Sequence, residues 1–228
     1  MLQSNVVIWM IVIYGILGLI SGYAILYITD KLVQKKCSLK EITEPANILQ
    51  KKYAKWIICI INGLVWALAG WQTNNILLSI FTVVLFSLAL MIIVIDLRIR
   101  IIPNELILVM SAVGALFQLT QYGWKALLIA ILTMVVLMAF FLITMAVMGK
   151  GKVGAGDIKL AGVMGLVLGY PLILTGIIVM AIATLAYCMI GFKMCWLNKN
   201  SMIAYGPFMM VGLIATLVTV ILNTSFLG

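Results

Sequence analysis

Long uninterrupted apolar runs are the feature of this sequence that most restricts how the chain can fold. The run over residues 81–95 has two hydroxyl groups as its only polar side-chain groups. In the whole chain 65% of the residues are hydrophobic and 9% are charged, whereas soluble domains are about 45–50% apolar and about 25% charged. So few polar side chains cannot cover a water-exposed exterior. The sequence therefore predicts an all-α, polytopic integral membrane protein.

The apolar runs predict about eight transmembrane segments, since a helix needs about 20 apolar residues to cross a bilayer core. These segments lie near residues 5–28, 56–71, 76–96, 101–119, 125–148, 158–170, 172–194 and 202–226. Proline disfavours helix in the residue before it. Gly169-Tyr170-Pro171 therefore separates the sixth segment from the seventh and leaves the sixth short or partly re-entrant. The first charged residue is Asp30, so the first run lacks the basic start of a signal peptide and is expected to be a retained helix.

The positive charges indicate how these segments are oriented, because cytoplasmic loops of membrane proteins carry an excess of Lys and Arg. With the N-terminus outside, the inward loops hold 14 of the 15 Lys and Arg residues and leave only Lys125 outside. The net charge of +9 would suggest nucleic acid in a soluble protein, but here the loop excess accounts for it. We therefore expect the lipid bilayer as a partner and no nucleic acid.

Charge also divides the chain into three parts. We predict a first transmembrane helix over residues 1–29, a basic cytoplasmic loop over residues 30–55 and a seven-segment membrane domain over residues 56–228. The loop holds seven lysines, and each lysine near anionic headgroups contributes about 1 kcal/mol of attraction. Docking of a substrate is the alternative role for this loop.

The chain contains no histidine, which excludes several kinds of catalytic site. A Ser-His-Asp or Cys-His nucleophilic site, an HExxH zinc helix and a histidine proton relay all need this residue. No CxxC pair is present either, so neither a zinc knuckle nor a disulfide framework is indicated. We expect no metal and no cofactor. If the protein is a hydrolase, carboxylates are its acid and base.

Only six acids occur in the chain, so each can be considered. Three lie in the basic loop, where we expect solvent and lysines around them: Asp30, Glu41 and Glu44. Asp96 ends the third predicted span and Asp157 opens the sixth, which puts both at the cytoplasmic face. A carboxylate near the membrane interior costs several kcal/mol unless it is paired, and it is a functional candidate by default.

Each of these acids also has a structural alternative. Asp157 suits the N-terminus of a helix, where the helix dipole favours an acid, and Asp96 can pair with Arg98 or Arg100. Glu105 follows a proline turn and is expected to be a first-turn partner of the helix dipole. The glycines before Asp157 allow close approach of the backbone to a ligand or another helix.

Three motif blocks occur in a recognisable order. The first is IDLRIRIIPN at residues 95–104, the second is GAGDIKL at residues 154–160, and the third is AYGPF at residues 204–208. Together they resemble the type IV prepilin leader peptidases, a family of membrane aspartic proteases whose second block reads GxGDxKL. The resemblance extends over roughly residues 56–222. Any one block is weak, but the three in order with this membrane topology are specific.

The resemblance implies a membrane aspartic endopeptidase that removes a short basic leader from type IV prepilin-like or pseudopilin precursors, as in type IV pilus assembly or protein secretion. The cut would fall at the cytoplasmic face of the cell membrane, between the leader and a hydrophobic helix. Asp96 and Asp157 would share a proton and activate water, with either residue as the base. The residues expected to bind substrate or support this pair are Arg98, Pro103, Asn104, Glu105, Gly154, Gly156, Lys159, Gly206 and Pro207.

Departures from the family pattern argue against a second activity. Many members also methylate the new N-terminus with S-adenosylmethionine, and these members carry paired CxxC motifs and a first-helix signature resembling GSFLNVVIYR. Here the loop has the single cysteine Cys37, and the stretch SGYAILYI at residues 21–28 lacks the Asn and Arg. We therefore expect neither methyltransferase activity nor zinc. Ala204 stands where the family usually has proline, which leaves the aspartates untouched.

Three other interpretations remain open at this point. A presenilin-like intramembrane aspartic protease shares GxGD, but its first aspartate usually follows a tyrosine, whereas Asp96 follows Ile95. A small proton-coupled transporter could use the two aspartates as a relay, although transporters usually place such acids near the membrane midplane. A non-catalytic assembly partner is the third.

Overall fold

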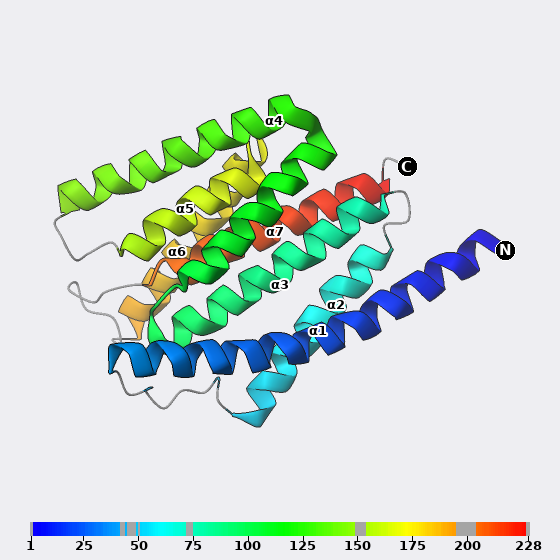
Figure 1. Ribbon diagram of the computed structural model, residues 1–228, viewed down its shortest axis with the longest axis horizontal. Helices are drawn as coiled ribbons and strands as arrows, with labels where there is room; N and C mark the ends of the chain where they lie inside the picture. Colours follow the sequence, from blue (N-terminus) through cyan, green and yellow to red (C-terminus); the bar gives the residue numbers. More distant parts are fainter. Residues whose placement is uncertain are drawn as a thin grey trace. The chain divides into compact units, whose positions relative to one another are not determined.

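The computed structural model describes residues 2–41, 44, 49, 51–71, 75–148, 154–194 and 204–226 (Figure 1). The described residues form seven helices and no strand. The chain divides into two compact units, and each is described here by itself. The first unit comprises Met1–Arg100 and Leu217–Gly228, and the second comprises Ile101–Thr216.

The first unit contains three helices and the end of a fourth. These are α1 (Leu2–Lys40), α2 (Lys52–Gly70), α3 (Ile76–Ile99) and the last part of α7 (Gly206–Phe226). Glycines let α1 and α2 pack closely along their lengths: a Cβ at Gly18 would lie 2.5 Å from Cβ of Trp66, and a Cβ at Gly70 would lie 2.9 Å from the carbonyl oxygen of Met10. Small residues at helix contacts are typical of packing in membranes.

Buried polar side chains join these three helices. Asn62 of α2 donates to the carbonyl oxygen of Gly18 at 2.7 Å and to the hydroxyl of Ser21 at 2.9 Å. Ser87 of α3 donates to the side-chain oxygen of Asn62 at 2.9 Å and accepts from the indole N–H of Trp66 at 3.0 Å. Such hydrogen bonds between helices hold a bundle together where lipid offers no hydrophobic driving force.

Helix α1 is longer than a bilayer requires. Its 39 residues extend for about 58 Å at 1.5 Å per residue, while the hydrocarbon core is about 30 Å thick. Residues 30–40, which the sequence assigned to the basic loop, therefore continue the first helix. The charged residues mark where the apolar run stops, but the helix continues beyond it.

The second unit consists of α4 (Asn104–Met148), α5 (Ala155–Leu168), α6 (Leu172–Lys193) and the first part of α7. Gly123, with φ 85° and ψ 177°, interrupts α4 and divides it into two arms (Figure 1). These arms correspond to the fourth and fifth predicted segments. Only glycine adopts such a positive φ readily, so a single residue produces the bend.

Helix α5 packs against both arms of α4. A Cβ at Gly114 would lie 2.6 Å from Cγ2 of Val167, and a Cβ at Gly162 would lie 2.7 Å from Cγ of Met138. From Ile158 to Leu168 every residue except Lys159 is buried. This 14-residue helix confirms the short sixth segment, and the break at Gly169-Tyr170-Pro171 is confirmed because α6 begins at Leu172.

The polytopic helical fold is confirmed by helix length and composition. Five described helices are long and apolar enough to cross a membrane: Val7–Lys40, Lys52–Gly70, Ile76–Ile99, Asn104–Val147 and Leu172–Lys193. Large apolar side chains such as Trp9, Leu132 and Ile182 are more than 60% exposed. Water does not favour such surfaces, whereas a bilayer does. With the two arms of α4 counted separately, the described helices give the eight expected segments.

Candidate active site

Asp96 lies in the last turn of α3 and is buried, with 4% of its surface exposed. Its carbonyl oxygen accepts the N–H of Arg100 at 2.9 Å, and Arg100 closes the helix in the left-handed conformation with φ 51° and ψ 38°. An acid at the carboxyl end of a helix is disfavoured by the helix dipole. Helix stability therefore does not account for an aspartate at this position.

Asp157 lies in the first turn of α5, half-buried, and contacts the backbone that precedes it. Its Oδ2 accepts the N–H of Gly154 at 3.2 Å. A Cβ at Gly154 would lie 3.1 Å from the same oxygen, so the glycine leaves the carboxylate room. The helix-capping alternative for Asp157 is thus realised as a contact, and the helix dipole favours an acid there.

The proline turn of the first block meets the glycine block within the second unit. A Cβ at Gly156 would lie 3.3 Å from Cβ of Ile102, so the two residues pack closely. Nearby, Nζ of Lys159 donates to Oδ1 of Asn104 at 3.0 Å. The sequence predicted roles for Lys159 and Asn104 separately and missed this bond, because 55 residues separate the two.

The remaining predicted residues of the proline turn begin α4. The carbonyl oxygen of Pro103 accepts the N–H of Leu106 at 3.2 Å and that of Ile107 at 3.3 Å, and Pro103 itself is buried. Glu105 is exposed in the first turn of the helix. This is the position where the helix dipole favours an acid.

The third block begins α7. Gly206 and Pro207 are buried in the first turn of this helix, where proline is well tolerated because its missing N–H has no partner to lose. The next residue, Phe208, packs its ring against Tyr187 of α6 with 5.2 Å between the ring centroids. The third block is therefore tied to α6 within the second unit.

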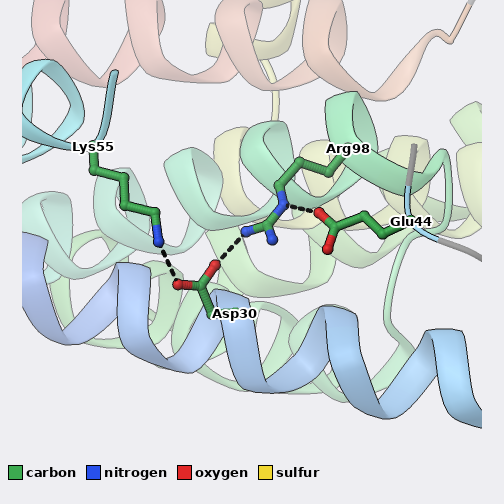
Figure 2. A network of polar contacts seen from close by, with 4 residues as sticks. All are labelled: Asp30, Glu44, Lys55 and Arg98. Carbon is green, nitrogen blue, oxygen red and sulfur yellow. Dashed lines mark hydrogen bonds and ion pairs between the residues drawn. The ribbon is translucent and has the colours of Figure 1, made fainter. Parts of the chain in front are cut away.

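Arg98 is nearly enclosed in the first unit, and its side chain is 6% exposed. Its Nη1 donates to Oδ1 of Asp30 at 2.5 Å and its Nε donates to Oε1 of Glu44 at 2.6 Å (Figure 2). The other oxygen of Asp30, Oδ2, accepts from Nζ of Lys55 at 2.6 Å. The expectation that only solvent and lysines surround Asp30 and Glu44 was therefore wrong. A buried guanidinium needs paired carboxylates, and these two acids supply them.

The predicted site residues thus fall in both units. Asp96 and Arg98 belong to the first unit, while residues 102–104 and 154–159 belong to the second. The boundary at Arg100 and Ile101 divides the first motif block. Asp30 and Glu44, which bind Arg98, were not among the expected site residues. Acids in an otherwise basic segment are a sequence signal that could have identified them.

Residues 83–228 match the model of the type IV leader peptidase family. The match covers well over half of the chain. The chain belongs to this family. Comparison with curated proteins and with solved structures gave no match. Family membership makes the protein a peptidase, and the helices make it a multi-pass membrane protein. The matched region contains Asp96, Glu105 and Asp157 and begins after the other three acids.

Proposed function

We propose that this peptidase is an aspartic endopeptidase that removes a short basic leader from prepilin-like or pseudopilin precursors, with Asp96 and Asp157 as its catalytic pair. The observation that carries the proposal is the scarcity of acids in the family region. Residues 83–228 contain no histidine and three acids. One of them, Glu105, is exposed at a helix start, which leaves the two aspartates of the motif blocks.

The chemistry needs one carboxylate and one carboxylic acid. The carboxylate takes a proton from water, and the resulting hydroxide oxygen bonds to the carbonyl carbon of the scissile peptide. The protonated partner donates to the carbonyl oxygen as negative charge develops there. The carbon–nitrogen bond then breaks and the nitrogen takes up a proton, which yields the leader's carboxylate and a new N-terminus. Either aspartate can act as the base, because a close pair titrates as a unit.

The neighbouring residues support this role through their local geometry. Gly154 is exposed and carries no side chain beside the carboxylate of Asp157, and this is where an extended substrate segment can approach Asp157. The bond between Lys159 and Asn104 fixes the proline turn beside that helix start. We place the site at the cytoplasmic face of the cell membrane, on the basis of the distribution of Lys and Arg.

Family membership favours this function over a presenilin-like protease, a proton-coupled transporter or a non-catalytic assembly partner. The expected substrates carry a basic leader and a hydrophobic helix. Neither zinc nor S-adenosylmethionine enters the proposal, since the loop lacks paired cysteines.

The test is cleavage of a prepilin with a basic leader and a Gly-Phe junction. The prepilin is mixed with membranes that contain the full chain, and removal of the leader is detected as a shift on a gel. We expect Asp96→Asn and Asp157→Asn each to lower the cleavage rate by about 100- to 10,000-fold, the usual contribution of a positioned acid or base. Glu41→Gln is the matched control, because Glu41 is an exposed acid outside the family region. Cleavage at the wild-type rate by either aspartate variant would refute the catalytic pair.

A further inference from the structure

The network of Asp30, Glu44, Lys55 and Arg98 joins four separate segments of the first unit (Figure 2). Asp30 lies on α1, Glu44 follows α1, Lys55 lies on α2, and Arg98 lies on α3. The two carboxylates and two cations balance in charge. Arg98 is the most enclosed member, with a side chain 6% exposed against 31% for Asp30, 22% for Glu44 and 36% for Lys55.

The position of Arg98 on α3 relates it to Asp96. Successive residues of an α-helix are rotated by about 100°, so two residues apart means a rotation of about 200°. Arg98 reaches Asp30 on α1, so Asp96 is directed toward the opposite side of α3. The network therefore contacts one side of the last turn of α3 through Arg98, while Asp96 lies on the other side.

The last turn of α3 is a part of the helix that side-chain contacts can stabilise. The final carbonyl groups of a helix have no partners further along the helix, and α3 ends at Ile99 with Arg100 in a left-handed conformation that residues other than glycine seldom adopt. Side-chain anchoring at Arg98 resists fraying of this turn. A guanidinium that lost both acids would be a buried, uncompensated charge, which is strongly unfavourable, and its side chain would leave this position.

We propose that Asp30 and Glu44 are positioning residues: by holding Arg98, they fix the rotation of the last turn of α3 and hence the direction of the Asp96 carboxyl group. The catalytic consequence rests on the proposed function. The effect on the helix end does not, since it follows from contacts within the first unit. The proposal can therefore be tested with and without peptidase activity.

The first experiment measures the exposure of position 96 without using catalysis. Asp96→Cys is made in a full-length chain whose four native cysteines are replaced by alanine, and labelling by a small maleimide is timed in membranes. We expect slow labelling with the network intact and labelling at least fivefold faster when Asp30→Asn and Glu44→Gln are added. Glu41→Gln, a change of the same kind at an exposed position, is expected to leave the rate unchanged. Equal rates in all three proteins would overturn the proposal.

The second experiment measures cleavage. We expect Asp30→Asn with Glu44→Gln to lower kcat at least tenfold with KM changed less than twofold, because the substrate contacts remain. If both acids act through Arg98, adding their substitutions to Arg98→Gln should lower kcat no further, whereas independent effects would multiply. Asp30→Glu, which keeps the charge, should restore most of the rate lost by Asp30→Asn.

The outcomes separate the two proposals. If Asp96→Asn abolishes cleavage while the Asp30 and Glu44 variants retain full kcat and slow labelling, the positioning role is overturned and the catalytic pair stands. If Asp96→Asn cleaves normally, the catalytic pair fails, and the labelling rates alone decide whether the two acids hold the end of α3.

Discussion

At the start of α5, Asp157 contacts the backbone of Gly154, three residues earlier in the sequence. At the end of α3, by contrast, Arg98, which lies two residues after Asp96, is bound by Glu44 and Asp30, 54 and 68 residues away. The first arrangement is local and is specified by a short stretch of sequence. The second needs α1, the segment after it and α3 to be packed already. One proposed catalytic residue therefore depends on a motif, and the other depends on the assembled first unit.

The difference teaches where variation can be tolerated. A local arrangement moves as a unit with its helix, so distant changes affect it little. An arrangement that spans three segments is sensitive to substitutions far from the catalytic residue in sequence. Substitutions at Arg98, Asp157 and Lys159 should therefore differ in their effect on stability.

Arg98→Ala should be the most damaging of these substitutions for stability. It leaves Asp30 and Glu44 without their guanidinium partner, and breaking a fully buried pair costs about 3–5 kcal/mol. Because both acids are partly exposed, we expect a loss of about 2–3 kcal/mol, visible as a lower midpoint of thermal unfolding in detergent. Cleavage should fall less than in the aspartate variants.

The matched control for this change is Arg100→Ala. It removes the same charge two residues later, at an exposed position, and exposed substitutions usually change stability by less than about 0.5 kcal/mol. Equal unfolding midpoints for the two variants would show that the contacts of Arg98 contribute no stability.

Asp157→Ala should have an intermediate effect on stability. It removes the oxygen that accepts the N–H of Gly154, the N-cap residue of α5, and the loss of one such hydrogen bond costs about 0.5–1.5 kcal/mol. Asp157→Asn keeps an acceptor oxygen and should leave the unfolding midpoint within about 0.5 kcal/mol of the wild type, although both variants should fail to cleave. If Asn and Ala unfold alike, the contact with Gly154 is not what stabilises the start of α5.

The same contrast explains how much of the molecule the sequence could predict. Long apolar runs identified the helices, and the Gly-Tyr-Pro break identified the short sixth segment, because these signals are contained in contiguous residues. The continuation of α1 to Lys40 was missed, since charged residues mark the end of the apolar run without ending a helix. The two segments expected near residues 101–119 and 125–148 correspond to the two arms of α4, which the non-helical residue Gly123 separates.

For the candidate site, the motif blocks alone supplied the hypothesis that Asp96, Asp157, Gly154 and Gly156 take part, and this hypothesis stays a prediction. The partners of Arg98 could not be found in this way, because pairing across 54 or 68 residues depends on the register of packed helices. Hydrophobic periodicity does not encode that register when nearly every residue of a helix is apolar. The scarcity of acids in the chain was the usable signal, because an acid in a lysine-rich segment is a candidate partner for a buried arginine elsewhere.

Lys159→Ala should have the smallest effect, and it tests whether a long-range contact is always important. Lys159 reaches Asn104 across 55 residues, but both residues are exposed, so solvent can replace the lost hydrogen bond. Exposed polar contacts contribute about 0–1 kcal/mol, and we expect a change in this range with cleavage lowered less than threefold. Asn104→Ala should match it, and the double variant should lose no more than either single one. A loss as large as that of Arg98→Ala would show that sequence separation, rather than burial, determines the importance of a contact in this peptidase.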